Sequence, residues 1–436
     1  MTVPLYFEDV PIGEISVGSN GPSFIYDRGW EATPEAFPLS LLMPIEGVQF
    51  GPEIVLPWVM NLLPENPHLS IVGRWLGVAP QDAIGLLEKI GRDVAGAISV
   101  GRTRPDDRPT WRPVGSEADL ERLIEELPRR PFLAGDQGIS MSLAGAQEKL
   151  PVAVVDGGIA IPMGGTPSTH ILKPDNRHLY GSVQNEAFCL VLAHRSGMRA
   201  ASATTGMAKG RSYLLVERYD RTFADGRWRR IHQEDFCQAL GKPPAAKYER
   251  NQSGFKGPRL SDMFALVGRC MTAADRLRLL DAVIFNVLIC NTDAHAKNYS
   301  VLFHGRRAGL APLYDLMCAA AWEGITANLA QTIGGKNRGG HIHARHWQRM
   351  AAECGLRGVA VLRRVGALAT RVEGEIDAAC QEVRAMPAGD HPMLPLFANE
   401  VRRRCATVKA NLESSVDVDV DDDGDALDDQ PTLESS

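Results

Sequence analysis

The chain has 436 residues, of which 44% are hydrophobic and 23% are charged, a composition typical of globular proteins that bury a large core. Its net charge of −6 is unevenly distributed, because residues 413–436 contain eight Asp, two Glu and no Lys or Arg, which leaves about +4 for the rest. This weak positive charge permits a nucleic-acid partner without requiring one, and the lack of a long apolar run excludes a hydrophobic membrane-spanning helix. A chain of this length usually forms two or three domains.

The eight cysteines form no C-x-x-C pair, and several lie in apolar runs such as residues 287–290. We interpret them as reduced core residues of a cytoplasmic protein and not as a disulfide framework. Residues 1–9 lack the basic and then apolar segments of a signal peptide, so we expect a cytoplasmic location and no membrane partner.

Residues 1–102 mix short strands and helices and are predicted to form an N-terminal α/β subdomain. The predicted strands and helices lie at residues 15–17, 23–26, 55–63 and 83–90. Residues 103–138 begin with a polar stretch rich in Pro and Arg and then contain a helical pattern at 117–127. We interpret this segment as a connector.

Residues 139–235 follow the order of elements in a kinase small lobe, and residues 236–411 are mostly helical, as in a kinase large lobe. In the first part, Asp156-Gly157 is a hairpin turn signal between two apolar strands. The predicted elements are strands at 151–155, 159–161, 169–173 and 213–216 and a helix at 183–196. The predicted fold class is therefore α+β: a protein-kinase-like two-lobed fold, with a β-rich small lobe, a helical large lobe and the extra N-terminal subdomain.

The strongest chemical signal is the segment 291–298, which follows a predicted buried helix and precedes a predicted strand. Asp293 and Asn298 stand five residues apart, the spacing between the catalytic base and a metal-binding asparagine in a kinase catalytic loop. Asp315 follows the apolar stretch 310–314, where a kinase places its second metal ligand at the end of a strand, although no Phe-Gly follows it here. Taken singly, these residues could also be ordinary turn residues.

Two further segments fit phosphate binding. Lys173 ends a strand and Glu186 lies on the next helix, so they could form the ion pair that holds a phosphate-binding lysine; a solvated lysine and a surface glutamate are the alternative. Residues 142–149, Ser-Leu-Ala-Gly-Ala-Gln-Glu-Lys, form a small-residue loop that permits close approach of the backbone to phosphates.

Taken together, these segments resemble the HipA family in order and spacing over nearly the whole chain, from Leu5 to Asn411. The resemblance rests on residues 38–40, 61–64, 90–97, 142–149, 170–173, 185–186, 216–221, 233–238, 291–298 and 312–315.

The resemblance implies a serine/threonine protein kinase that uses ATP and Mg²⁺. Asp293 would be the catalytic base, and Asn298 and Asp315 would bind the metal. The residues that it implies for nucleotide binding are Ala144, Gly145, Ala146, Gln147, Glu148 and Lys149 over the phosphates, Lys173 on them, Glu217, Arg218 and Tyr219 at the adenine hinge, and His295, Lys297, Asn298, Tyr314 and Asp315 around the site. Ser142 would be autophosphorylated, and its modification would eject the loop and switch the enzyme off; Ser140 is a rival acceptor.

The resemblance also implies a toxin that phosphorylates a serine of a translation protein, such as an aminoacyl-tRNA synthetase. A HipB-like helix-turn-helix antitoxin would neutralise it, and operator DNA would be bound mainly through the antitoxin. The basic loop 334–341 lies where the family approaches DNA, and a solvated loop is the alternative.

Two features lie outside this pattern. Residues 412–436 are expected to be a disordered acidic tail, because they are strongly acidic and contain too few apolar residues to pack. The segment starting at 419 resembles the opening of an EF-hand loop, but its twelfth position is Gln430 and no flanking helix follows. The histidines at 341, 343 and 346 lack the partners of a zinc site. The alternative functions are a weakly active ATP-binding corepressor that acts with the antitoxin, and a kinase of small molecules.

Overall fold

The computed structural model describes residues 1–101 and 109–414. Residues 102–108 of the predicted connector and residues 415–436 of the predicted acidic tail, with the EF-hand-like segment, lie outside the described residues. Within the described part, no helix combines the length and the apolar character that a membrane span needs. The chain divides into two compact units: the first contains residues 1–174, 207–247 and 300–311, and the second contains residues 175–206, 248–299 and the chain from 312 onward.

The first unit opens with an antiparallel sheet in the order β3-β2-β1-β4. Its strands are β1 (Thr2–Phe7), β2 (Val10–Gly18), β3 (Gly21–Tyr26) and β4 (Ile98–Val100). The helices that follow β3 are α1 (Arg28–Glu31), α2 (Pro52–Met60), α3 (His68–Leu76) and α4 (Ala83–Ile90). Leu5, Ile15 and Phe24 are fully buried, as expected when alternate residues of each strand face a core.

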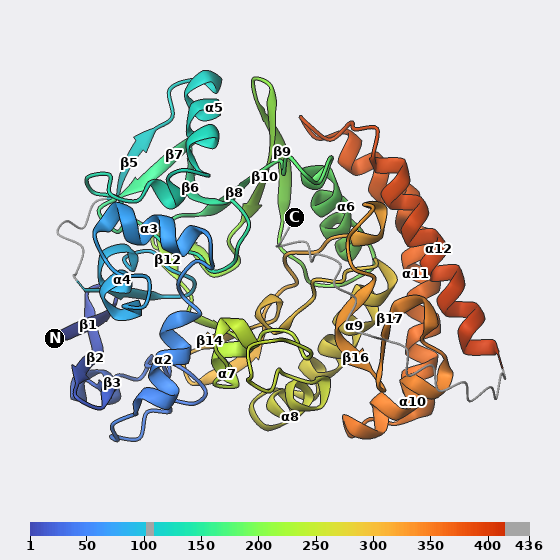
Figure 1. Ribbon diagram of the computed structural model, residues 1–436, viewed down its shortest axis with the longest axis horizontal. Helices are drawn as coiled ribbons and strands as arrows, with labels where there is room; N and C mark the ends of the chain where they lie inside the picture. The colour runs from blue at the N-terminus through green and yellow to red at the C-terminus, as the bar shows by residue number, and fades with distance from the viewer. Residues whose placement is uncertain (102–108, 415–436) are drawn as a thin grey trace. The chain divides into compact units, whose positions relative to one another are not determined.

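A six-stranded sheet, most of which belongs to the first unit, follows in the order β5-β7-β6-β8-β10-β9 (Figure 1). Its strands are β5 (Thr110–Pro113), β6 (Leu150–Val155), β7 (Gly158–Met163), β8 (His170–Pro174), β9 (Ala203–Ala208) and β10 (Arg211–Glu217). The predicted hairpin is confirmed, since Asp156 and Gly157 both have positive φ angles between β6 and β7, as a tight hairpin turn requires. Strand β5 was not predicted; it pairs with β7 and is followed by α5 (Glu117–Glu126) and η1 (Pro131–Leu133).

Two smaller sheets complete the first unit. The strands β11 (Arg221–Ala224) and β12 (Arg227–Arg230) form a ribbon, and β13 (Gln233–Asp235), β14 (Ser300–His304) and β15 (Arg307–Leu310) form a three-stranded sheet. The short helices α7 (Phe236–Ala239) and η2 (Pro244–Ala246) follow β13. Because β14 pairs with β13, the chain returns to the first unit directly after the segment 291–298.

The second unit is mainly helical. Its helices are α6 (Ser182–Arg195), α8 (Leu260–Cys270), α9 (Ala273–Leu288), α10 (Ala344–Glu353), α11 (Gly358–Arg384) and α12 (Leu394–Glu413), with η3 (Ala296–Asn298), η4 (Ala319–Ala321) and η5 (Gly339–His341). The long helix α11 packs against α6, α9 and α12. The last half of α9 is buried on all sides, which explains why its sequence is apolar without a polar stripe.

The predicted basic loop 334–341 is an ordered hairpin in the second unit. Its first two residues, Gly334 and Gly335, have positive φ angles and form the turn after β16 (Asn328–Ile333), and the rest contains β17 (Lys336–Arg338) and η5. Arg349 donates a hydrogen bond to the carbonyl of Gly334, at 3.3 Å. The segment is therefore packed against its own unit and is not simply a solvated loop.

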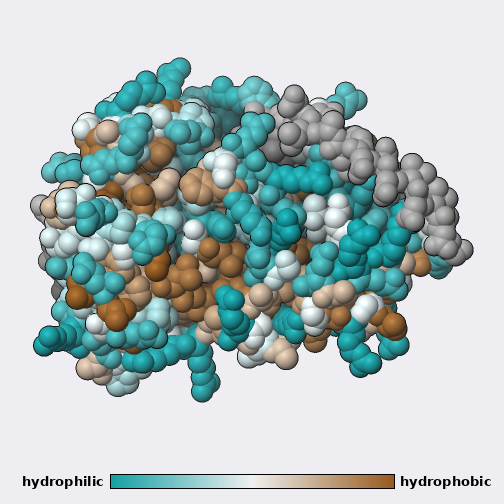
Figure 2. Space-filling view, turned by 60° about the horizontal axis from the view of Figure 1, so that its bottom comes forward, coloured by the Kyte–Doolittle hydropathy of each residue, from teal (hydrophilic) through white to brown (hydrophobic). Residues whose placement is uncertain are grey.

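On the face shown in Figure 2, hydrophilic side chains predominate and hydrophobic residues gather near the middle.

Candidate active site

The segment 291–298 begins where α9 ends. Cys290 has a positive φ angle of 61°, which turns the chain out of the helix. The buried Asn291 then fixes the loop, because its side-chain NH₂ donates to Oδ1 of Asn286 at 3.0 Å and its own Oδ1 accepts from the backbone N–H of Asp293 at 3.1 Å. The buried end of α9 thus anchors the loop that carries Asp293.

Asp293 and Asn298 lie side by side, as their spacing suggested. The side-chain NH₂ of Asn298 donates to the backbone carbonyl of Asp293 at 2.7 Å, which directs the amide nitrogen of Asn298 toward the loop. The Oδ1 atom of Asp293 accepts a hydrogen bond from the hydroxyl of Tyr248. Tyr248 was not singled out in the sequence, because 45 residues separate it from Asp293 and no local pattern links them.

Asp315 lies in the same unit, next to this loop. Its backbone carbonyl accepts from the side chain of Asn291 at 3.4 Å, and the hydroxyl of Tyr314 donates to the carbonyl of Lys297 at 2.6 Å. The expectation that Asp315 ends a strand is wrong: β15 ends at Leu310, and Asp315 has a positive φ of 51° within a loop. Ala311 still donates its N–H to the carbonyl of Ser300 at 2.9 Å, but the next donor, Leu313, bonds the carbonyl of Arg199 at 2.9 Å instead of β14.

Lys173 and Glu186 lie on elements of different units. Lys173 is buried on β8, directly opposite Leu214 of β10. Glu186 is buried on α6 in the second unit. The alternative of a solvated lysine and a surface glutamate is therefore wrong for both residues, because neither is exposed. Their ion pair stays a prediction.

The loop 142–149 is folded inward in the first unit. Ser142 is completely buried; its hydroxyl donates to the carbonyl of Leu62 at 2.8 Å, and its N–H donates to the carbonyl of Asp93 at 3.0 Å. The ammonium group of Lys149 donates to the carbonyl of Ala144 at 2.7 Å, which closes the loop on itself.

Gly145 is the glycine that this loop requires. Its φ angle is 105°, and a Cβ added there would lie 2.7 Å from Nζ of Lys149. Its carbonyl accepts from the backbone N–H of Glu65 at 3.2 Å. The segment 62–65 therefore holds the loop at two points, Ser142 and Gly145.

Arg218 of the predicted hinge, residues 217–219, belongs to a cluster of buried ion pairs. Arg218 donates to Asp220 at 2.7 Å and lies 3.7 Å from the carboxylate of Asp93, while Arg221 contacts Asp93 at 2.9 Å. Burial tends to raise the pKa of Asp93, but the surrounding guanidinium groups outweigh it and lower that pKa below its ordinary value. The side chain of Arg218 is thus engaged within the protein.

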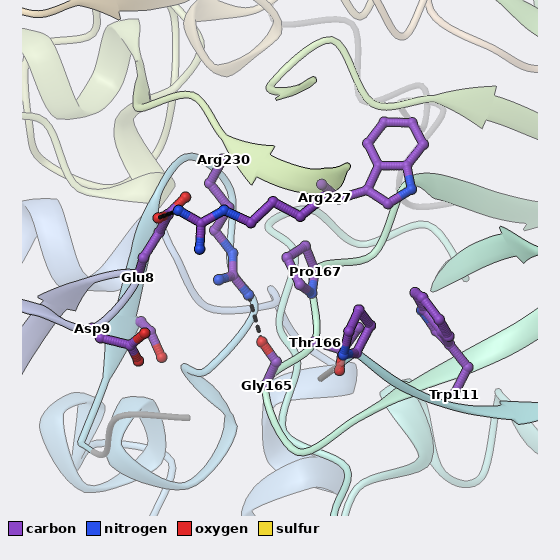
Figure 3. A pocket seen from close by; sticks show the side chains of 11 residues that line it. Glu8, Asp9, Trp111, Gly165, Thr166, Pro167, Arg227 and Arg230 are labelled. Carbon is purple, nitrogen blue, oxygen red and sulfur yellow. Dashed lines mark hydrogen bonds and ion pairs between the residues drawn. The ribbon is translucent and has the colours of Figure 1, made fainter. Parts of the chain in front are cut away.

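The pocket in Figure 3 is a separate feature of the first unit. Glu8, Trp111, Arg227 and Arg230 are among its lining residues, and Arg227 forms an ion pair with Glu8 at 3.3 Å. None of the residues predicted for the active site lines it.

The two units have the features of the protein kinase class. One unit is rich in β-strands and has a buried lysine on a strand, and the other is helical and has an Asp-Asn loop after a buried helix. Residues 3–101 match the HipA N-terminal domain, and residues 141–383 match the HipA-like C-terminal domain. The chain belongs to the HipA family of serine/threonine protein kinases, as the sequence predicted.

Known proteins are similar to this chain in sequence and structure over most of its length. A candidate kinase of Sinorhizobium fredii, Y4mE, is 36% identical over 92% of this chain and 97% of its own. The serine/threonine-protein kinase toxin HipA of Shewanella oneidensis is 32% identical over 76% of this chain and 78% of its own. A Shewanella oneidensis HipA structure in complex with HipB and its operator DNA matches with a TM-score of 0.82 and 26% identity, covering 94% of this chain and 97% of that one. The predicted fold class, with its extra N-terminal subdomain, is therefore confirmed, whereas the exact domain boundaries stay predictions.

Proposed function

We propose that this HipA-family kinase transfers the γ-phosphate of ATP to a serine of a target protein, such as an aminoacyl-tRNA synthetase. The observation that carries the proposal is the loop in which Asp293 and Asn298 are hydrogen-bonded neighbours and Asp315 lies close by. Asp293 would accept the proton of the attacking serine hydroxyl. Lys173 and the loop from Ala144 to Lys149 would bind the phosphates of ATP.

Mg²⁺ fits the chemistry of Asn298 and Asp315. The amide nitrogen of Asn298 is engaged with the Asp293 carbonyl, so its amide oxygen is the atom suited to a metal, and Asp315 adds a carboxylate. Among the described residues, no cluster of three His, Cys, Asp or Glu side chains could hold a metal by itself. Proteins usually bind Mg²⁺ through one or two carboxylates together with the phosphates of the substrate, so Asp315 and ATP would supply such ligands. The ion would neutralise charge on those phosphates.

Adenine would lie against the backbone of Glu217, Arg218 and Tyr219. The hydroxyl of Tyr219 is held by Gln233 at 2.6 Å, and the Arg218 side chain is held by Asp220, so both side chains support the hinge from within the first unit. His295, Lys297 and Tyr314 would line the nucleotide on the side of the catalytic loop.

Ser142 would be the autophosphorylated residue that switches the enzyme off. Its hydroxyl is completely buried against the Leu62 carbonyl, which leaves no room for a phosphate with nearly two negative charges. A phosphorylated loop could not keep this inward position and would lose its place over ATP. Ser140 remains the rival acceptor; its hydroxyl is held by the carbonyl of Lys89 at 2.7 Å.

A HipB-like antitoxin and operator DNA are the proposed partners, because the matching Shewanella oneidensis HipA structure contains both. The hairpin 334–341 would approach the DNA, and the protein would act in the cytoplasm. The alternative is a weakly active corepressor, which would need ATP binding but not Asp293.

The test is mass spectrometry of the protein after incubation with ATP and Mg²⁺. We expect phosphate on Ser142 in the wild-type chain and none in Asp293→Ala incubated alone. Phosphate only on Ser140 would refute the Ser142 switch, and equal phosphate in both proteins would refute the role of Asp293. The corepressor would be favoured if the wild-type protein had no kinase activity and Asp293→Ala still repressed the operator. Phosphoproteomics after induced expression would identify the target.

A further inference from the structure

Tyr248 is the one side chain shown above to touch the carboxylate of Asp293 that the proposed mechanism does not use. Its hydroxyl donates to Oδ1 of Asp293, and its ring stands edge-on to the ring of His295, with centroids 5.1 Å apart and an angle of 87° between the planes. The last torsion of an aspartate side chain is broad, so a carboxylate without an oriented donor can rotate. A donor fixed on one oxygen restricts this rotation and so orients the carboxylate.

The backbone around Tyr248 is held by several contacts, although the residue lies outside helices and strands. Its carbonyl accepts from the side chain of Asn251 at 3.0 Å, and a Cβ on Gly257 would lie 1.9 Å from the same oxygen. The next residue, Glu249, donates its N–H to the carbonyl of Ala330 at 3.0 Å. These contacts fix the point from which the phenol reaches Asp293.

The preceding residue links this position to the N-terminal domain. Lys247 is the last residue of the first unit before the chain enters the second unit at Tyr248. Its buried ammonium group forms an ion pair with Glu65 at 2.7 Å. Glu65 also donates its backbone N–H to the carbonyl of Gly145, and nearby Leu62 accepts from Ser142. The segment 62–65 therefore holds both the 142–149 loop and the residue next to Tyr248.

We propose that Tyr248 is a positioning residue for Asp293, and that the Glu65–Lys247 ion pair lets the N-terminal domain control that position. This inference rests on the proposed function of Asp293 as the base. It makes the segment 62–65 a common support: release of the 142–149 loop would remove the Gly145 contact of Glu65 and loosen the support of Lys247. Loss of phosphate binding and loss of an aligned base would then occur together.

The first test is steady-state MgATP turnover by the full chain, measured as ADP release with casein as the acceptor. Tyr248→Phe keeps the ring against His295 and removes only the hydroxyl, so we expect kcat to fall roughly 10- to 100-fold, the loss expected for one hydrogen bond to a charged group. The KM for ATP should stay unchanged, because Tyr248 does not bind the nucleotide in this proposal. Substitution of Tyr248 by 4-aminophenylalanine restores a donor at the same place and should recover most of kcat.

The matched control is Tyr180→Phe, which removes the hydroxyl of a tyrosine that is 62% exposed and packs against His391. It should leave kcat and the melting temperature unchanged. A wild-type kcat in Tyr248→Phe, while Asp293→Ala is inactive, would overturn the positioning role and leave the proposed function intact. Activity in Asp293→Ala would instead overturn the proposed function itself. A parallel fall of kcat and of melting temperature that 4-aminophenylalanine does not rescue would reduce Tyr248 to a structural residue.

The second test places Glu65→Gln in the wild-type and in the Tyr248→Phe backgrounds. If the ion pair acts through Tyr248, Glu65→Gln lowers kcat several-fold in the first background and has no further effect in the second. Glu375→Gln is the control, because it breaks a surface ion pair with Arg195. An equal effect of Glu65→Gln in both backgrounds would refute the coupling to the N-terminal domain.

Discussion

The buried ion cluster behind the proposed hinge permits a stability prediction with a worked magnitude. Asp93 is enclosed by Arg221 at 2.9 Å, Arg230 at 3.3 Å and Arg218 at 3.7 Å, and all four side chains are at most 5% exposed. Asp220 is the other carboxylate of the cluster. Asp93→Asn preserves the shape of the side chain but leaves three guanidinium groups with a single carboxylate. Breaking a buried ion pair from one side costs about 3–5 kcal/mol.

The expected loss can be measured as a melting temperature. For a unit of this size, 1 kcal/mol corresponds to about 2–4 °C, so Asp93→Asn should lower the melting temperature of the first unit by roughly 10 °C. Asp225→Asn is the control, because its ion pair with Arg229 is exposed and such pairs contribute at most about 1 kcal/mol. Equal melting temperatures of the wild-type protein and Asp93→Asn would refute the argument that this charge is needed in the core.

The pH dependence gives the same prediction a second readout. The pKa of Asp93 is lowered in the folded protein, so its contribution is complete above the ordinary aspartate pKa of about 4 and is lost as the pH falls below it. The melting temperature of the wild-type protein should therefore decrease more steeply below pH 4 than that of Asp93→Asn. Parallel acid profiles of the two proteins would show that Asp93 does not supply this stability.

Three further predictions concern the catalytic and phosphate-binding segments. Asp293→Ala should lower the rate of phosphate transfer about 10²- to 10⁴-fold and keep ATP binding, as radiolabel transfer and calorimetry would show; full activity would remove the residue from this role. Asn298→Ala and Asp315→Ala should each weaken ATP binding in the presence of Mg²⁺ but not in its absence, and unchanged calorimetric titrations would mean that the metal site is elsewhere. Gly145→Ala should weaken ATP binding, because a φ of 105° is strained for any residue with a Cβ and the methyl group would displace the ammonium group of Lys149; wild-type affinity would contradict the proposed place of this loop over the phosphates.

Features encoded by neighbouring residues could be predicted from the sequence. The turn at Asp156-Gly157, the apolar helix before the catalytic loop and the spacing of Asp293 and Asn298 each depend on a few consecutive residues whose backbone preferences are local. The joint order of such segments also predicted the family and the kinase-like fold, since each segment constrains the next along one chain. The role of each site residue stays a prediction.

Only the tertiary structure decided which distant side chains meet. The hydrogen bond from Tyr248 to Asp293 spans 45 residues, that from Ser142 to Leu62 spans 80, and that from Arg221 to Asp93 spans 128. Tyrosine, serine and arginine occur in many environments, so their identity does not specify a partner far along the chain. Such contacts form only when packing of the apolar core brings the segments together and makes an unpaired buried polar group too costly. The sequence thus determined the family, the fold class and the local turn of the segment 291–298, whereas folding determined what holds that segment, the loop 142–149 and residues 217–219 in place.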